Sequence, residues 1–172
     1  MLDNVSCGDY EIRSLLEEIA GACMYRSNTL AGGKAFILTG TGSNGKSTYL
    51  KTLSNLMSEK NISALDLKKL GDRFSTVMMF GKLANIGDDI SNEFVTDTSL
   101  FKKVVTGETI DAEQKGQPKF DFKPFCKLLF SANNIPRMGK GSDSQAIMRR
   151  LVIVPFNAKF KSDDPNFRPS IE

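Results

Sequence analysis

The sequence of 172 residues predicts an α/β domain with a central, mainly parallel β-sheet flanked by helices. Three observations lead to this prediction. Short apolar runs typical of buried strands alternate with segments in which apolar residues recur at helical spacing. A glycine-rich loop joins one such strand to one such helix. Polar residues follow two other apolar strands, as expected where the ends of parallel strands meet at one edge of a sheet.

The first third of the chain contains a helix, a strand and a second helix. Residues 10–25 are predicted to be helical because their apolar side chains fall on one helical face. The run Ala-Phe-Ile-Leu at 35–38 has the length and composition of a buried strand. A second helix is expected from about 46 to 59, directly after the glycine-rich loop.

The rest of the chain continues this alternation. A strand is expected over 82–86 and a helix over 96–105. Residues 108–123 hold a glycine and a proline between polar and aromatic residues, which indicates a β-hairpin. Two further apolar strands are predicted over 126–131 and 151–155.

The composition excludes several classes of protein. The chain has no histidine, which excludes histidine-based catalytic triads, cysteine–histidine dyads and histidine-ligated metal sites. Cys7, Cys23 and Cys126 are odd in number and far apart, which argues against a disulfide scaffold or zinc ribbon and favours a reducing, cytoplasmic setting. No apolar run is long enough to predict a membrane-spanning helix, and the acidic N-terminus does not resemble a secretory signal.

Positive charge is concentrated in one part of the chain. The net charge is +3, and residues 101–150 hold 10 basic against 5 acidic residues. The basic residues of this block are Lys102, Lys103, Lys115, Lys119, Lys123, Lys127, Arg137, Lys140, Arg149 and Arg150. The block is consistent with a polyanionic partner, and equally with a solvated basic face.

The glycine-rich loop matches a phosphate-binding motif. Residues 40–47 read Gly-Thr-Gly-Ser-Asn-Gly-Lys-Ser, the pattern GxxxxGK[ST], in the required position between a strand and a helix. Such glycines let backbone N–H groups point at phosphate, and the helix N-terminus adds a positive partial charge. Lys46 is expected to contact the β- and γ-phosphates of ATP, and Ser47 to bind Mg²⁺. The residues predicted to hold the nucleotide are Gly40, Thr41, Gly42, Ser43, Asn44, Gly45, Lys46, Ser47 and Thr48.

A dinucleotide-binding motif competes for the same loop. Gly40, Gly42 and Gly45 also spell GxGxxG, and Asp66 follows about twenty residues later, as in the dinucleotide fingerprint. The pair Lys46-Ser47 favours the phosphate loop, because the dinucleotide motif gives no reason for it.

Acidic and amide side chains stand at the predicted ends of two strands. Asp88 and Asp89 end the strand over 82–86, and a triphosphate site needs such carboxylates to bind Mg²⁺ and to orient the attacking water. Asn133 and Asn134 follow the strand over 126–131, and an amide there could position that water. Each of these patterns, taken alone, is also typical of a solvated turn.

Two arginines precede the last predicted strand. Arg149 and Arg150 could stabilise the charge on a transferring phosphoryl group, in the same chain or from a neighbouring one. The alternative is a surface pair at a helix end, where the helix dipole favours positive charge.

Five segments in this order resemble the helicase domain of phage and plasmid primase-helicases, a branch of the superfamily 3 helicases. The segments are GTGSNGKST, GDDIS, FKKVVTGETIDAEQKGQPKFDFKP, KLLFSANNIP and MRRLVIVPF, and they cover residues from about 36 to 160. The resemblance implies a P-loop NTPase fold of the AAA+-related type with a β-hairpin insertion. It also implies a homo-oligomeric ring, usually hexameric, that uses ATP and Mg²⁺ to move along single-stranded or forked DNA.

The resemblance further implies roles for individual residues. The nucleotide-site positions of the family correspond to Gly40, Gly45, Lys46, Ser47, Asp88, Asp89 and Asn133. Asp89 stands where the family usually has Glu, so the division of roles between the two acids stays open. One of Arg149 and Arg150 is expected to act as an arginine finger in the neighbouring site, and which one stays open.

The DNA-contacting loop of the family lies between the acids and the amide. Lys115 is the expected tip of this loop, with Lys102 or Lys103 in support and Lys119 beside it. Electrostatics supports this position, because lysines on a hairpin can bind the phosphates of a DNA backbone. Base stacking by Phe120 and Phe122 is an alternative to a core position for these rings.

The resemblance predicts three parts of the chain. Residues 1–30 are a helical lead-in, residues 31–160 the motor domain, and residues 161–172 a tail. The primase and C-terminal domains of the family are missing, which predicts a fragment of a longer replication protein, encoded by a phage, prophage or plasmid and working in the cytoplasm of a bacterial host. The alternatives are another P-loop or dinucleotide-binding enzyme, or a non-catalytic DNA-binding assembly module.

Overall fold

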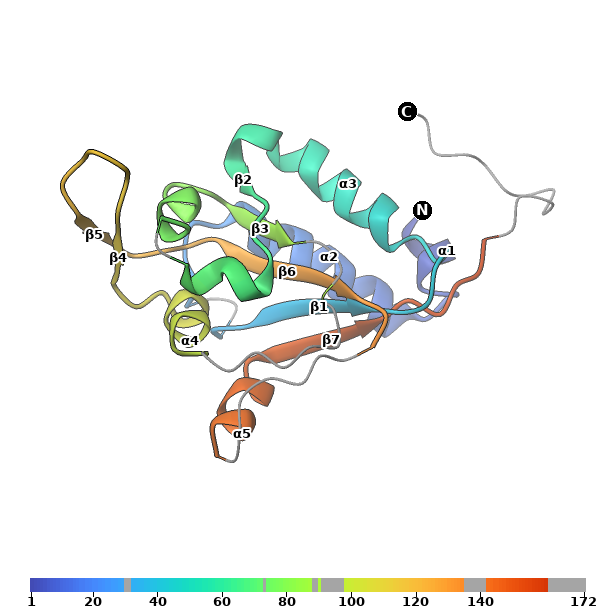
Figure 1. The fold of residues 1–172 in the computed structure, drawn as a ribbon. Helices are drawn as coiled ribbons and strands as arrows, with labels where there is room; N and C mark the ends of the chain where they lie inside the picture. Colours follow the sequence, from blue (N-terminus) through green and yellow to red (C-terminus); the bar gives the residue numbers. More distant parts are fainter. Residues whose placement is uncertain (30–31, 73, 88–89, 91–97, 135–141, 161–172) are drawn as a thin grey trace.

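A five-stranded parallel sheet forms the centre of the protein. The computed structural model describes residues 1–29, 32–72, 74–87, 90, 98–134 and 142–160, and within these the sheet has the order β2-β3-β6-β1-β7. The strands are β1 (Ala35–Thr39), β2 (Ile62–Ser63), β3 (Ala84–Gly87), β6 (Lys127–Ala132) and β7 (Leu151–Pro155). Every pair of neighbours in it is parallel (Figure 1), which confirms the predicted fold class.

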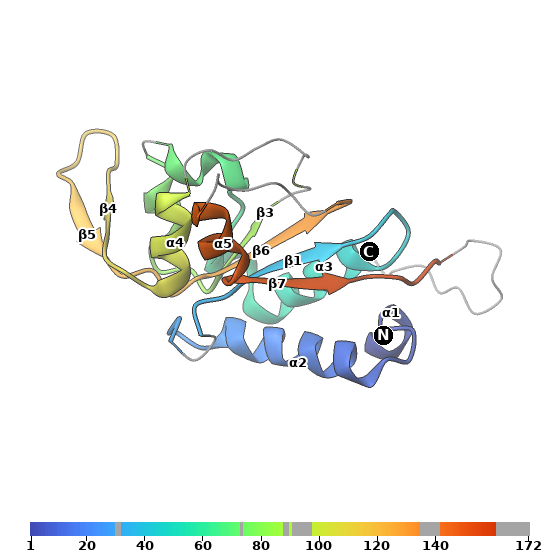
Figure 2. The same ribbon diagram turned by 90° about the horizontal axis from the view of Figure 1, so that it is seen from below.

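Helices cover both faces of this sheet (Figure 2). One face packs against α2 (Tyr10–Met24) and α3 (Lys46–Met57), and the short α1 (Leu2–Val5) joins the same apolar cluster. The other face packs against α4 (Ser99–Thr106), α5 (Ser142–Met148) and two 3-10 segments, Leu67–Gly71 and Thr76–Met79. Alternation along the strands feeds the two clusters: Leu129 lies in the first, and its neighbours Leu128 and Phe130 lie in the second.

The predicted hairpin forms a separate two-stranded antiparallel sheet. Its strands are β4 (Ile110–Ala112) and β5 (Phe120–Phe122), with Asp111 opposite Asp121. The hairpin projects from the end of the molecule where the main strands begin (Figure 1). It therefore lies away from the loop that follows β1.

The helix boundaries differ from the predicted ones by a few residues. Asp9 caps α2, because its carboxylate accepts hydrogen bonds from two N–H groups of the first turn. The helix predicted to reach residue 59 ends at Met57, and Ser58 then adopts φ +67° before a 3-10 turn over Glu59–Asn61. The helix predicted from residue 96 begins at Ser99. Residues 96–97 and the predicted tail over 161–172 lie outside the described residues.

Asn85 attaches the short edge strand β2 to β3. The side chain is fully buried, and its Oδ1 accepts hydrogen bonds from the Ser63 hydroxyl (2.9 Å) and the Leu65 N–H (2.8 Å). Its Nδ2 donates to the Leu65 carbonyl (2.9 Å). Because β2 has only two paired residues, these side-chain bonds hold much of this edge of the sheet.

We expect Asn85→Ala to lower the free energy of unfolding by about 2–3 kcal/mol, because it leaves buried polar groups of Ser63 and Leu65 without partners. Chemical denaturation measures this loss. Asn61→Ala is the control: it removes one half-buried hydrogen bond, to Met57, and should cost about 1 kcal/mol or less. Equal losses for the two variants would contradict the role of Asn85.

Candidate functional site

The loop over residues 40–45 joins β1 to α3 and has a tightly turned backbone. Gly40, Ser43 and Gly45 have φ values of +146°, +59° and +90°. A Cβ on Gly45 would lie 2.5 Å from the Val5 side chain, so no larger residue fits there without movement of Val5. The outer residues Thr41, Gly42 and Ser43 are exposed. The glycines of the motif thus serve the loop conformation that a phosphate-binding backbone requires.

The first turn of α3 continues this surface. Lys46 is buried, and its amine donates to the Gly40 carbonyl, which holds the positive charge over the loop. Ser47 and Thr48, the next two residues of the helix, are exposed. The glycine-rich loop, Lys46 and Ser47 thus stand together at the junction of β1 and α3, where the phosphate-loop motif has them.

The polar end of β6 lies at the same end of the sheet as this loop. Thr39 pairs with Ala132, and the Gly40 N–H donates to the Ala132 carbonyl (3.2 Å), so Asn133 directly follows a residue bonded to the loop. Asn133 is exposed. The structure thus brings the strand ends of β1 and β6 together.

The two predicted acids, Asp88 and Asp89, lie outside the described residues. The residues on both sides of them are held beside β6. Gly87 pairs with Phe130, and the Ile90 N–H donates to the Ser131 carbonyl (2.8 Å). The carboxyl end of β3, at Gly87, therefore lies at the same end of the sheet as the loop.

The order of the strands argues against the dinucleotide-binding alternative. In that fold the strand after the glycine-rich helix pairs with the first strand. Here β1 pairs with β6 and β7, and β2 lies at the far edge, separated from β1 by β3 and β6. Asp66 follows β2 and pairs with Lys69 (3.0 Å). It therefore does not stand beside the strand that leads into the loop.

The two arginines lie at the opposite end of the strands from the loop: they stand beside the start of β1, and the loop follows its carboxyl end. The Arg150 carbonyl accepts a hydrogen bond from the Ala35 N–H (2.8 Å), which fixes the pair at the start of β1. Five residue steps along β1 then separate them from Gly40, about 16 Å at 3.3 Å per residue. Arg149 is exposed, whereas Arg150 is half-buried and donates to the Ala146 carbonyl (2.7 Å).

The predicted DNA-contacting lysines lie on the hairpin and on α4. Lys115 is exposed at the hairpin turn, where the Gln117 N–H donates to the Gln114 carbonyl (3.0 Å). Lys119 is 3.6 Å from the Glu113 carboxylate, so its charge is partly matched within the hairpin. Lys103 is exposed on α4, and Lys102 is half-buried. These four lysines are on the side of the molecule away from the loop.

The hairpin phenylalanines belong to a small aromatic cluster. Phe120 and Phe122 are half-buried, and the Phe80 ring makes edge-on contacts with both, at centroid distances of 5.1 and 5.3 Å. Phe122 also packs against the main core. Sequence reasoning placed Phe120 and Phe122 nearer the core than the surface, but it missed Phe80, whose side chain is 55% exposed.

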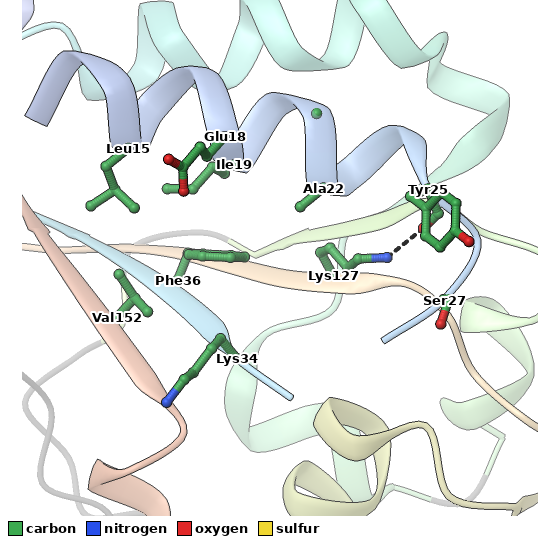
Figure 3. A pocket seen from close by; sticks show the side chains of 11 residues that line it. Leu15, Glu18, Ile19, Ala22, Tyr25, Ser27, Lys34, Phe36, Lys127 and Val152 are labelled. Carbon is green, nitrogen blue, oxygen red and sulfur yellow. Dashed lines mark hydrogen bonds between the residues drawn. The ribbon is translucent and has the colours of Figure 1, made fainter. Parts of the chain in front are cut away.

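Lys127 does not belong to the predicted basic surface, and this is a correction. It is 2% exposed, and its amine donates to the carbonyls of Tyr25 (2.5 Å) and Phe125 (2.9 Å). Burial lowers its pKa. Lys127 is the first residue of β6, a strand that is mostly buried. The end of α2 covers its side chain (Figure 3). A lysine here contributes to packing and not to binding a polyanion.

A pocket of about 480 Å³ lies over this buried lysine (Figure 3). It is formed between α2 and the strands β1 and β7, with apolar walls from Leu15, Ile19, Phe36 and Val152. No residue of the phosphate loop lines it. The pocket is therefore separate from the candidate nucleotide site.

The described residues contain neither a cluster of metal-binding side chains nor a membrane-spanning helix. No group of three or more histidine, cysteine, aspartate or glutamate side chains gathers in a way that could hold a metal ion by itself. No helix within these residues is long and apolar enough to span a bilayer.

Residues that sequence reasoning missed are Phe156 and Phe160, which follow β7 and bond to the loop. Nothing in their local sequence marks this contact.

Comparison with known proteins identifies relatives. A family model described as "Family of unknown function (DUF5906)" matches residues 38–150, more than half of the chain. The protein named "Putative helicase 184R" of Invertebrate iridescent virus 6 is 28% identical over 137 residues, which cover 73% of this chain and 14% of the relative. A protein of Acanthamoeba polyphaga mimivirus, also named "Putative helicase", is 26% identical over 159 residues, 88% of this chain and 16% of the relative. The chain thus spans a small part of the length of both relatives.

Solved structures share the fold. The C-terminal region of NrS-1 matches with a TM-score of 0.73 and 20% identity, over 95% of this chain and 38% of that one. The JCV helicase matches with a TM-score of 0.53 and 16% identity, over 90% of this chain and 43% of that one. The chain therefore shares its α/β fold with the NrS-1 C-terminal region and the JCV helicase, and it belongs to the DUF5906 family, a family of unknown function.

Proposed function

We propose that this chain is the ATP-hydrolysing motor domain of a DNA helicase. The observation that carries the proposal is the phosphate loop between β1 and α3, with the Asn133 strand end bonded beside it at one edge of the sheet. The relatives named helicases support the same reading. We further propose that residues 31–160 form the motor, that residues 1–30 lead into it, and that residues 161–172 form a tail.

The loop and the strand ends would divide the chemistry of ATP hydrolysis. Backbone N–H groups of residues 40–45 and the Lys46 amine would bind the phosphates. Ser47 and one of Asp88 and Asp89 would hold Mg²⁺, which supplies charge neutralisation on the phosphates when it is bound. The other acid would orient the attacking water, and Asn133 would help to position it.

The arginines would serve the site of a neighbouring copy. They lie about 16 Å along β1 from the loop of their own chain, too far for either side chain to reach it. Arg149 is exposed, whereas Arg150 is held against α5 by its bond to Ala146, so Arg149 is the better finger. Shared sites of this kind require a homo-oligomer, which we propose is a ring around DNA.

Single-stranded or forked DNA would contact the hairpin. Lys115 is exposed at the tip of the hairpin, Lys119 is on the same hairpin, and Lys102 and Lys103 are on α4. Lysine contacts with phosphate give binding that tolerates any sequence and weakens with salt.

The experiment that tests the function is ATP hydrolysis with and without single-stranded DNA, at low salt and over a range of protein concentration. Turnover that rises with DNA, and steeply with protein concentration, supports a motor with sites shared between copies. Mg-ATP turnover that never responds to DNA contradicts the helicase proposal and favours another P-loop enzyme. DNA binding without any Mg-ATP binding favours the non-catalytic assembly module.

The hairpin assignment gives a separate prediction. Lys115→Ala should weaken binding of single-stranded DNA about three- to tenfold and reduce the slope of log affinity against log salt by about 0.7, the value for one phosphate contact. Lys119→Ala should have a smaller effect, because Glu113 already pairs with this lysine. Fluorescence anisotropy over a salt series measures both quantities. Unchanged affinity and slope for Lys115→Ala would refute the assignment of the tip.

A further inference from the structure

The phosphate loop rests on a segment from the other end of the chain. After β7 the Phe156 N–H donates to the Thr39 carbonyl (2.7 Å), just before the loop. The Phe160 N–H donates to the Ser43 carbonyl inside the loop (2.8 Å). Residues 156–160, which we call the backing segment, are therefore bonded to the loop region at two points.

The Asn44 side chain is a third connection between the loop and the backing segment. Asn44 is 3% exposed, although the three residues before it, 41–43, are exposed. Its Nδ2 donates to the Phe156 carbonyl (3.3 Å), and its Oδ1 accepts from the Lys46 N–H (3.3 Å). The carboxamide thus faces the interior and bonds on one side to the backing segment and on the other to the start of α3.

Close packing leaves the loop little room at these contacts. A Cβ on Gly40 would lie 2.4 Å from the Phe156 carbonyl oxygen and 2.5 Å from Asn44 Nδ2. A Cβ on Gly45 would lie 2.5 Å from Val5 and 3.2 Å from the Phe160 ring. Backbone and side chains of the backing segment therefore touch the loop at both of its ends.

We propose that Asn44 is a positioning residue that fixes the phosphate loop on the backing segment in its nucleotide-binding conformation. The inference rests on the proposed function, because it concerns the same ATP site. A phosphate loop binds mainly through backbone N–H groups, so its affinity depends on how well those groups are already converged. A loop that must be ordered on binding loses affinity by the cost of that ordering. The Asn44 side chain limits this cost from the inner side of the loop, through its bonds to Phe156 and to the start of α3.

Two substitutions at Asn44 separate its two bonds. Asn44→Ala removes both, and we expect the Kd for Mg²⁺ and a fluorescent ATP analogue to rise about tenfold. Asn44→Ser keeps an oxygen that can accept from an N–H two residues on, but it is too short to reach the Phe156 carbonyl. We expect it to raise the Kd less than Asn44→Ala does. Both variants should change the Kd more than the hydrolysis rate at saturating ATP, because each substitution alters only a side chain that holds the loop and leaves its backbone N–H groups and Lys46 present.

Asn61→Ala is the matched control. It removes one asparagine hydrogen bond, from Nδ2 to the Met57 carbonyl (2.8 Å), beyond the opposite end of α3. Its thermal stability should fall, but its nucleotide Kd should equal that of the wild type. A purely structural role for Asn44 predicts that the two asparagine variants behave alike.

Changes on the backing segment test the same inference without altering the loop. Phe160→Pro removes the N–H that bonds to Ser43, whereas Phe160→Ala keeps this N–H and removes only the ring. We expect the proline variant to raise the nucleotide Kd beyond the alanine variant. If Asn44→Ala does not fold, the smaller change Asn44→Ser decides the role of Asn44: an unchanged Kd for it would contradict the inference.

The outcomes distinguish the inference from the proposed function. Wild-type protein that binds no Mg-ATP contradicts the proposed function, and the inference with it. Wild-type protein that binds, together with unchanged Kd values for Asn44→Ala and Phe160→Pro, contradicts the inference alone. A fall in the saturated rate with an unchanged Kd also overturns it, because Asn44 would then act on the chemical step.

Discussion

Lys46→Ala is expected to slow ATP hydrolysis by about 10²–10³-fold. The Lys46 amine is held over the phosphate loop by its bond to the Gly40 carbonyl, at the start of α3. Alanine removes the positive charge that would face the β- and γ-phosphates, and the backbone N–H groups of the loop cannot replace it. The backbone of α3 should persist, because alanine is the best helix former.

Steady-state hydrolysis over a series of ATP concentrations measures this loss. Lys51→Ala is the matched control, since Lys51 is exposed on the same helix and outside the loop. It removes an equal charge and should leave the rate unchanged. Circular dichroism of both variants shows whether the fold is kept. A Lys46→Ala protein that folds and hydrolyses ATP within about threefold of the wild type would rule out the phosphate loop as the site of hydrolysis.

Strong local signals explain how much of the fold the sequence predicts. The strand over 35–38, the glycine-rich loop and the helix from residue 46 are joined in one short motif, and the structure confirms all three. The strand over 151–155 matches β7 at both ends. The antiparallel pairing of β4 with β5 confirms the hairpin over 108–123. It was predictable because a glycine and a proline separate two short runs of β-type residues.

Features that depend on tertiary contacts were not predictable. The strand β2 has two residues, too few for a period, and it is held by the Asn85 side chain from the neighbouring strand. The contact of Asn44 with Phe156 joins residues 112 positions apart. Lys127 looks like a surface charge in the sequence, but two backbone carbonyls that satisfy its amine come from packing around β6.

The candidate site likewise contains residues that the sequence predicts and a choice that only the structure could make. The motif predicts that Lys46 and Ser47 stand at the loop, and the parallel strands bring Asn133 to the same edge. The sequence left open which arginine acts, because adjacent residues cannot be ranked without knowing which side chain is exposed. The structure supplies this difference: Arg149 is exposed, and Arg150 bonds to Ala146. The roles of all these residues remain predictions for experiment.

Arg149→Ala is expected to reduce ATP hydrolysis about 10³-fold, the usual effect of losing an arginine finger. Because Arg149 lies about 16 Å along the sheet from its own loop, the proposed action of this arginine on ATP would be at the site of a neighbouring copy. Arg150→Ala is the comparison. It should lower the stability by loss of the bond to Ala146, with a smaller effect on the rate at saturating ATP.

Mixing two inactive variants tests action between copies directly. An Arg149→Ala subunit keeps its phosphate loop, and a Lys46→Ala subunit keeps its arginine. Where the second subunit presents Arg149 to the loop of the first, a complete site forms, which occurs at about a quarter of the interfaces in a random ring of equal parts. Hydrolysis should therefore reappear on mixing and exceed the sum of the two separate variants. If subunits exchange, as labelled protein would show, and every mixture stays inactive, then Arg149 does not complete a neighbouring site. A mixture of Lys46→Ala with Arg150→Ala should show no such gain, because Arg150→Ala subunits keep both Lys46 and Arg149 and already form complete sites with one another.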